Sequence, residues 1–303
     1  MATQTTVARP VDVPPAIDPP RPAARGRRRP SVYRTLSRIT IAVLTVAQVY
    51  PLVWLFLTSV RSEQDFASGK PFGLPTSFTL DNYRRAFAEG HLGVNIRNSF
   101  IVTMGANVLI VECGMMGAYA IQVLGFRFSN AVRAMFLIGI IVPVQIALVP
   151  LFIDYSKVNL LDTYQSMIIP LAGFALPMSI YLFSSFFSFI PRETYEAAAL
   201  DGAGPYRIFG HITLRMSVNT IVTVVMVNSI FIWNDFIFAN TFVLSDKLKT
   251  IPLGLQNYIG NMGKTDWTAT FAAVCVTVTP LLLAFLVLNR AVINGLEGGT
   301  KKA

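Results

Sequence analysis

Six stretches of this chain are long enough and apolar enough to cross a lipid bilayer, which takes about 20 mostly apolar residues in a helix. Because the bilayer interior offers the backbone no partners, each stretch must satisfy its own backbone hydrogen bonds as a helix. The composition agrees, since 53% of the 303 residues are hydrophobic, 14% are charged and the mean hydropathy is +0.54. The sequence therefore predicts an all-α integral membrane protein with six transmembrane helices, over residues 39–60, 100–124, 135–153, 167–187, 218–243 and 271–288.

The third of these stretches is the least regular, because Pro143, Gln145 and Pro150 interrupt it. A proline frees backbone groups that lipid cannot satisfy, so such a helix needs protein around the interruption. We therefore expect the third span to pack against other helices.

Residues 1–37 are expected to form a disordered, basic and proline-rich tail, followed by a membrane domain over residues 38–303. Seven of the 18 prolines lie within the first 30 residues, which contain no apolar stretch of signal-peptide type. The first hydrophobic segment is therefore expected to be a retained span.

Basic residues are distributed unequally between the two sides of the membrane. With the N-terminus inside, the inner segments hold 16 Lys and Arg and the outer loops hold 9. The positive-inside rule then places both termini and residues 191–216 in the cytoplasm. This orientation accounts for the basic residues behind the net charge of +9. The charge is therefore no reason to expect nucleic acid as a partner.

Residues 191–216 form a polar, helix-forming island between two predicted spans. Pro191 suits a first helical position, Gly202 supplies a stop, and Pro205 fits the first turn of a second helix. The pattern predicts helix, tight turn, helix; an amphipathic loop lying on the membrane surface is the alternative. An apolar stripe on the second helix is expected from Tyr206, Ile208, Phe209 and Ile212.

This island is similar to the "EAA" loop of permease subunits of ATP-binding-cassette importers, especially the carbohydrate-uptake, maltose-type branch. The similarity rests on Glu196, Ala197, Ala198, Asp201, Gly202, Ala203, Phe209, Ile212 and Leu214. It implies that these residues and Tyr206 form short coupling helices that dock in a cytoplasmic ATPase. The family pattern usually has a proline where this chain has Arg215. This difference affects the bend that the family pattern implies before the next span.

The resemblance runs in colinear order over about residues 38–300, with further matches at 78–83, 98–100, 142–145, 159–164, 233–235, 251–255 and 295–296. It implies the type I permease fold of ABC importers, in a prokaryotic cell membrane. The implied partners are a second permease subunit, two ATPase subunits that use ATP and Mg²⁺, and an extracytoplasmic sugar-binding protein. The implied cargo is a sugar, which we expect to be a di- or oligosaccharide.

Polar residues within predicted spans are candidates for function, because an ionisable group near the bilayer centre costs at least about 2.5 kcal/mol unless it is paired or hydrated. Asp235, next to Trp233 and Asn234, could line a sugar path through ring stacking and hydrogen bonds, or form a polar helix or subunit contact. Gln145 is a further candidate for the path. For Glu112, which small residues follow, we favour a structural hydrogen bond.

No catalytic, cofactor or metal site is expected in this chain. His91 and His211 have no ligand spacing with cysteine or carboxylate, and there is no G-x-x-x-x-G-K-[ST] phosphate loop. Cys113 and Cys275 both lie in apolar stretches. Two other classes stay open: an ion-coupled secondary transporter of a polar solute, against which no internal repeat is evident, and a membrane enzyme, against which ionisable residues are not clustered.

Overall fold

The computed structural model describes residues 32–68, 73–258 and 265–297, with side chains given up to residue 287. Within these ranges the regular structure is helical, and the β-type pairing is confined to one isolated bridge between Arg61 and Phe78. The chain divides into residues 1–50 and residues 51–303. Of the first part, the structure describes the beginning of α1 (Val32–Ser59), whose side chains are exposed. Of the predicted tail, residues 1–31 lie outside the described residues, whereas residues 32–37 already belong to α1.

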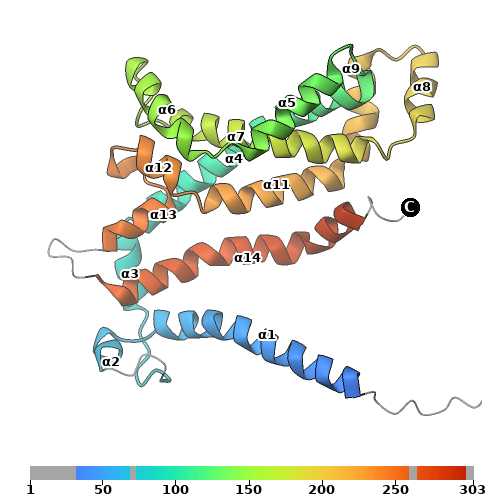
Figure 1. The fold of residues 1–303 in the computed structure, drawn as a ribbon. Coiled ribbons are helices and arrows are strands. Elements are labelled where there is room, and N and C mark those ends of the chain that lie inside the picture. Colours follow the sequence, from blue (N-terminus) through green and yellow to red (C-terminus); the bar gives the residue numbers. More distant parts are fainter. Residues whose placement is uncertain (1–31, 69–72, 259–264, 298–303) are drawn as a thin grey trace, which may run out of the picture. The chain divides into compact units, whose positions relative to one another are not determined.

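Four helices are individually long and apolar enough to cross a membrane: α1, α4 (Leu92–Tyr119) with the π-helical turn η1 (Ala120–Leu124), α7 (Tyr164–Phe187) and α14 (Trp267–Glu297). They correspond to the predicted first, second, fourth and sixth spans (Figure 1). Counting each of two bent helix pairs as one span gives up to six crossings among the described residues. The predicted all-helical membrane fold is confirmed.

The predicted third span is bent at its expected interruption. The chain forms α5 (Ser129–Ile141) and α6 (Gln145–Lys157), whose axes differ by 98°. Val142, the residue before Pro143, has an extended backbone with ψ 119°, because the proline ring disfavours helical geometry in its predecessor. As expected, both halves contact neighbouring helices: α5 packs against α7, and α6 packs against α12 (Ile237–Phe242), although neither α5 nor α6 has a fully buried residue.

The predicted fifth span, residues 218–243, is also interrupted. Helix α11 (Val218–Trp233) ends at Trp233, and α12 begins at Ile237. Asn234, Asp235 and Phe236 lie between the two helices. The break therefore lies at the residues that the sequence analysis selected as a path.

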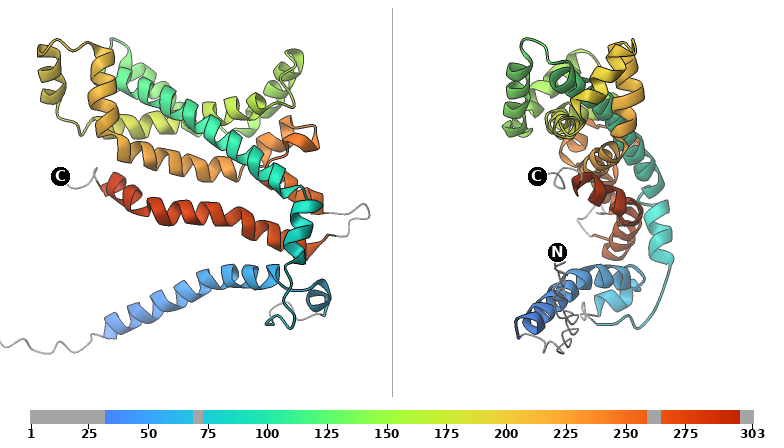
Figure 2. Two further views of the ribbon diagram at one scale, coloured as in Figure 1. Left: turned by 180° about the vertical axis from the view of Figure 1, so that it is seen from behind. Right: turned by 90° about the vertical axis from the view of Figure 1, so that its right-hand side faces the viewer.

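The core of the second part lies where α4 crosses α7 and α11 (Figures 1 and 2). Its fully buried side chains include Ile110 of α4, Phe183 of α7 and Val224 of α11. A Cβ at Gly114 would lie 3.3 Å from Phe183, and one at Gly117 would lie 3.2 Å from Ile180. Small residues thus allow α4 and α7 to approach closely, as expected for membrane helices.

Short helices complete the described chain. Those in the predicted outer segments are α2 (Glu63–Ala67), α3 (Asp81–Ala88), η3 (Asp246–Leu248), α13 (Ile251–Gly254) and η4 (Leu255–Tyr258). Those in the polar island are α8 (Arg192–Leu200), α9 (Pro205–Ile208), the π-helical turn η2 (Phe209–Thr213) and α10 (Leu214–Met216).

Candidate functional site

The turn after α8 has the hydrogen bonds of a Schellman motif. The N–H of Gly202 donates to the carbonyl of Ala199 at 3.0 Å, and the N–H of Ala203 donates to the carbonyl of Ala198 at 3.0 Å. Gly202 adopts φ +80°, the left-handed conformation that this motif requires. A Cβ on Gly202 would meet no atom within 4 Å, so backbone conformation rather than space demands glycine here. The predicted helix stop at Gly202 is confirmed.

The second helix starts as expected and the first differs by one position. Pro205 occupies the first turn of α9, directly after Gly204 in an extended conformation. Pro191 is not the first helical residue as predicted: with ψ 135° it occupies the N-cap position of α8, which begins at Arg192. The predicted order of helix, tight turn and helix is confirmed, with the second helix continuing through η2 and α10.

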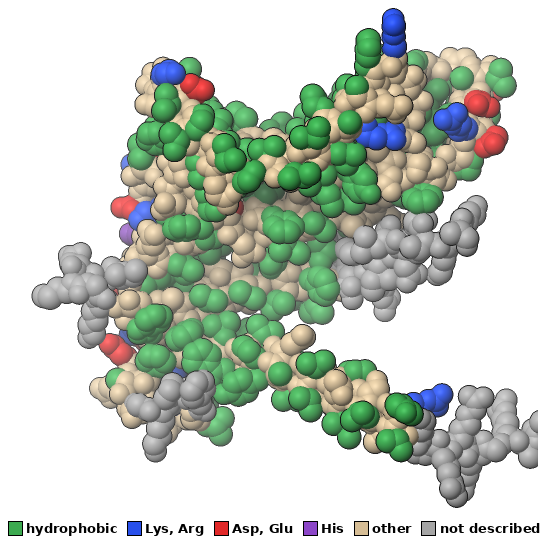
Figure 3. All heavy atoms as spheres, in the orientation of Figure 1, with side chains coloured by type: hydrophobic (Ala, Val, Ile, Leu, Met, Phe, Trp, Pro, Cys, Tyr) green, Lys and Arg blue, Asp and Glu red, His purple; other side chains and the backbone are tan. Residues whose placement is uncertain are grey.

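The candidate coupling residues fall into an exposed group and a half-buried group. Ala198, Ala203 and Phe209 are half-buried and pack against the core. Figure 3 shows acidic and basic side chains gathered over α8. The exposed members of the set are Glu196, Ala197, Asp201, Gly202 and Tyr206.

Tyr206 departs from the predicted apolar stripe. Ile208 is buried, and Phe209 and Ile212 pack against the core, but 89% of Tyr206 is exposed. Leu200, at the end of α8, is also 89% exposed. Two large apolar side chains are thus exposed on either side of the Gly202 turn, and Tyr206 does not face the core.

The polar island is anchored to the end of α4. The hydroxyl of Tyr119 donates to the carbonyl of Pro205 at 3.0 Å. The rings of Tyr119 and Phe209 lie 5.2 Å apart. A displacement of the start of α9 would therefore act directly on α4.

The bend into α11 forms without the family's usual proline. The segment Pro205–Met216 and α11 differ in direction by 73°. Between them lies Ser217, whose buried hydroxyl donates to the carbonyl of Thr213 at 2.6 Å. A serine that captures a carbonyl of the preceding turn bends a helix, so Ser217 can supply the bend next to the exposed Arg215.

The candidate path residues 233–235 lie together at the break between α11 and α12. Trp233 Nε1 donates to the carbonyl of Thr277 in α14 at 3.3 Å. Asp235 Oδ2 accepts the N–H groups of Phe238 at 3.1 Å and Ala239 at 3.3 Å, so this carboxylate caps α12. Asn234, the residue after α11, is exposed and donates to the carbonyl of Ile230 in α11.

Two other polar candidates lie elsewhere. Gln145 is exposed at the start of α6, and no hydrogen bond in the described part of the chain joins it to residues 233–235. Glu112 was expected to make a structural hydrogen bond, but it is exposed on α4 and makes none within the described residues. It borders a shallow, mostly apolar hollow beside Val111 and Val225.

Comparison with known proteins identifies the family. The model of the family described as binding-protein-dependent transport system inner membrane component matches residues 110–297. This chain belongs to that family. The permease is 31% identical to the diacetylchitobiose uptake system permease protein of Streptomyces coelicolor over 92% of each chain. It is 28% identical to the trehalose transport system permease protein of Mycobacterium tuberculosis, over 91% of this chain and 99% of the relative.

Solved structures share the fold of the permease. A chain of a bacterial ABC transporter that imports alginate covers 86% of the permease and is itself covered to 96%, with a TM-score of 0.74 at 17% identity. A chain of the MetNI methionine ABC transporter in an inward-facing conformation covers 67% of the permease, with a TM-score of 0.54 at 19% identity. At these identities the similarity establishes the fold of ABC importer permeases.

The permease also contains a polar network around Asn98 and Asp162 that the sequence analysis did not assign. Asn98, fully buried at the start of α4, donates to the carbonyls of Lys247 at 2.8 Å and Lys249 at 2.9 Å and accepts from the Tyr164 hydroxyl at 2.7 Å. Asp162 accepts the N–H groups of Leu244 and Ser245 at 3.0 Å each. Burial favours a raised pKa for Asp162, but these hydrogen bonds outweigh it and lower the pKa. Segment 244–249 is thus tied to α4 and to the loop before α7.

Proposed function

We propose that this chain is one permease subunit of an ATP-driven importer that moves a sugar of di- or oligosaccharide size into the cell. The relatives are named for uptake of diacetylchitobiose, trehalose and, at 28% identity, melibiose, raffinose and stachyose, which supports a carbohydrate cargo. The observation that carries the proposal is the α8–α9 segment, an ordered pair of short helices with exposed Leu200, Glu196 and Tyr206 around the Gly202 turn.

Energy would enter the permease through this segment. The sequence has no phosphate loop, so ATP and Mg²⁺ would be used by two cytoplasmic ATPase subunits rather than by this chain. The bonds from Tyr119 to Pro205 and from Ser217 to Thr213 join the segment to α4 and α11. Closure of the ATPases would therefore reposition two core helices together, as alternating access requires.

The remaining partners follow from the same proposal. A second, related permease subunit would pair with this one, and an extracytoplasmic binding protein would deliver the sugar. Both termini and α8 would lie in the cytoplasm, in agreement with the distribution of Lys and Arg. The break at Trp233, Asn234 and Asp235 is our candidate for contact with the sugar, because an interrupted helix exposes backbone and side-chain polar groups at membrane depth.

Reconstitution of the complete transporter tests the proposal. Proteoliposomes that contain the permease, its partner subunits and ATP should accumulate labelled sugar when the binding protein is present. Uptake should persist when ionophores collapse the ion gradients at constant ATP. Uptake that follows the ion gradient and ignores ATP would establish an ion-coupled secondary transporter instead. Mass spectrometry of the purified complex would identify both the subunits and the retained ligand.

A further inference from the structure

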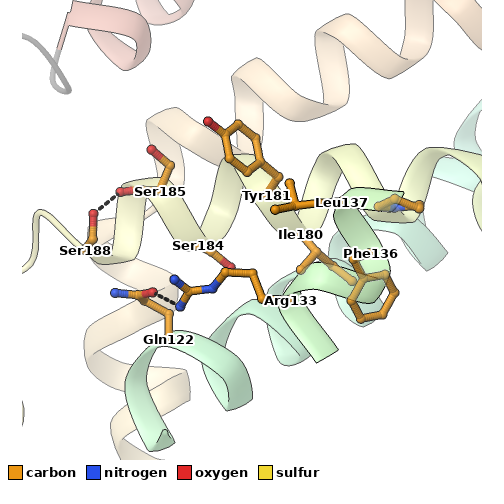
Figure 4. Close-up of a pocket in the computed structure, with 10 residues that line it drawn as sticks. Gln122, Arg133, Phe136, Leu137, Ile180, Tyr181, Ser184, Ser185 and Ser188 are labelled. Carbon is orange, nitrogen blue, oxygen red and sulfur yellow. Dashed lines mark hydrogen bonds between the residues drawn. The ribbon is translucent and has the colours of Figure 1, made fainter. Parts of the chain in front are cut away.

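A groove of about 240 Å³ lies between η1, α5 and α7 and is polar at one end and apolar at the other. Its polar end contains Gln122, Arg133, Ser184 and Ser188. Nη2 of Arg133 donates to Oε1 of Gln122 at 2.6 Å. Figure 4 shows these side chains on one side of the groove and Phe136 and Leu137 on the other.

The polar end has hydrogen-bonding capacity that the described protein does not use. Arg133 Nε and Ser184 Oγ are both shielded from water, and neither makes a hydrogen bond within the described residues. Ser184 as a whole is 7% exposed. A guanidinium N–H beside a hydroxyl matches the oxygens of an anion, and arginine is suited to phosphate in particular. None of the described residues that line the groove is acidic.

A neighbouring hollow continues the polar end toward α8. It shares Gln122 and Ser188 with the groove and adds Arg192, Tyr195 and Glu196. Among the described residues that line the groove and this hollow, Glu196 is accompanied by the two cations Arg133 and Arg192, so their net charge is positive. The positive charge around the polar end of the groove favours a ligand that carries at least one negative charge.

The apolar end has the shape and exposure that a hydrocarbon chain needs. Phe136 and Leu137 of α5 and Pro177 and Ile180 of α7 line it. Leu137 is 41% exposed, and its neighbour Ile138 is 65% exposed, so the wall on the α5 side opens outward. An isolated phosphate would leave this end unfilled, whereas an amphiphile would fill both ends.

We propose that this groove binds an anionic phospholipid, with the phosphate at Arg133 and Ser184 and an acyl chain along Leu137 and Ile180. In the orientation of the proposed function, the site faces the cytoplasmic leaflet, where basic pockets between helices bind anionic head groups. The bound lipid would join η1, α5 and the end of α7, from which the chain continues into α8. It would thereby brace the base of the coupling segment.

Lipid binding to the complete transporter tests this proposal without sugar or ATP, so its outcome is independent of the transport experiment. Native mass spectrometry would measure the affinity for dioleoyl phosphatidylglycerol in a background of phosphatidylcholine. Loss of one charge-assisted interaction in Arg133→Gln should weaken binding by about tenfold. Arg127→Gln is the matched control, since Arg127 is an exposed arginine six residues earlier and its loss should leave binding unchanged.

Leu137→Trp separates a lipid from free phosphate and also covers the case in which Arg133→Gln does not assemble. The indole should fill the apolar end and weaken phosphatidylglycerol binding, although the cation stays in place. Equal binding by wild type, Arg133→Gln and Leu137→Trp would overturn the proposal. Displacement of the lipid by millimolar inorganic phosphate, with Leu137→Trp binding the lipid as wild type does, would also overturn it in favour of a phosphate site.

Discussion

The N–H of Ala203 donates to the carbonyl of Ala198 across the Gly202 turn at 3.0 Å. This bond closes the Schellman motif, in which the residue before Ala203, here Gly202, adopts a positive φ. The direction of α9 relative to α8, and with it the spacing of Leu200 and Tyr206, therefore depends on one backbone conformation.

Gly202→Val should disrupt coupling more than any other single change in the segment. A β-branched residue at φ +80° is strained by at least about 1 kcal/mol. We expect normal membrane insertion with loss of ATPase co-purification and of ATP-driven uptake. Gly204→Val is the matched control, because Gly204 also has open space around it but φ −72°, and it should behave as wild type. Equal behaviour of both variants would exclude the turn as the cause.

Glu196→Ala should have a milder effect than Gly202→Val. The Glu196 side chain is exposed on α8, so its removal leaves the helix and the contacts of Ala198 with the core in place. We expect a partial reduction in the amount of ATPase retained on the purified permease. Full retention of the ATPase, together with full uptake, would remove Glu196 from the coupling surface.

Asp235→Asn should separate the structural role of this carboxylate from a role in the path. Asparagine caps helices nearly as well as aspartate, so thermal stability should be retained, whereas Asp235→Ala should lose about 1 kcal/mol. We expect sugar uptake by Asp235→Asn to fall, since the charge at the break is removed. Wild-type uptake at normal expression would assign Asp235 to the cap of α12 alone.

Cysteine accessibility should establish the orientation. In a variant without the native cysteines, Ser156→Cys in α6 should react with an impermeant thiol reagent from outside intact cells. Glu193→Cys in α8 should react only after permeabilisation. Both positions are exposed, so access to the reagent depends on the side of the membrane. Labelling of residue 193 in intact cells would contradict the cytoplasmic placement of α8.

Acid should weaken the fold around α2. The buried Arg61 lies 2.8 Å from Asp65, and this hydrogen bond and one from the N–H of Thr76 lower the Asp65 pKa from 3.8 to about 2. Because the folded pKa is depressed, the stabilisation is complete above about pH 4 and is lost as the pH falls through about 2. Thermal unfolding of the purified protein at pH 5 to 2 should show this loss, and Asp65→Asn should be less stable and lack this pH dependence. Asp154→Asn, which removes an exposed ion pair with Lys157, is the control and should change little.

Local chemistry was sufficient to predict several elements. The sequence predicted that the first helix of the polar island stops at Gly202 and that the second starts at Pro205, and the structure agrees. Both signals are local, because the positive φ of Gly202 and the missing N–H of Pro205 affect the backbone within one turn. The continuous spans were predictable for a similar reason, since the apolar length that a bilayer demands is a property of each segment alone.

Proline positions show where sequence information ended. Pro51, Pro170, Pro177 and Pro280 lie inside continuous helices, whereas Pro143 lies at the 98° break between α5 and α6. A proline frees a carbonyl and removes a donor in every case, but neighbouring helices decide whether the chain continues or turns. The sequence indicated that the third span is irregular, but it could not predict the 98° bend between α5 and α6.

Long-range placement was likewise decided only by the tertiary structure. The periodicity of the second helix assigned Tyr206 to the inner stripe, but α9 packs with Ile208 buried and Tyr206 exposed. Asn98 is separated from Lys247 and Lys249 by about 150 residues, and no local pattern indicates their hydrogen bonds. The sequence by itself determined which segments are helical and, at Gly202 and Pro205, where one helix stops and the next begins, because those are short-range properties. Which faces meet, and which side chains are left for a partner, was decided by packing between segments distant in the chain.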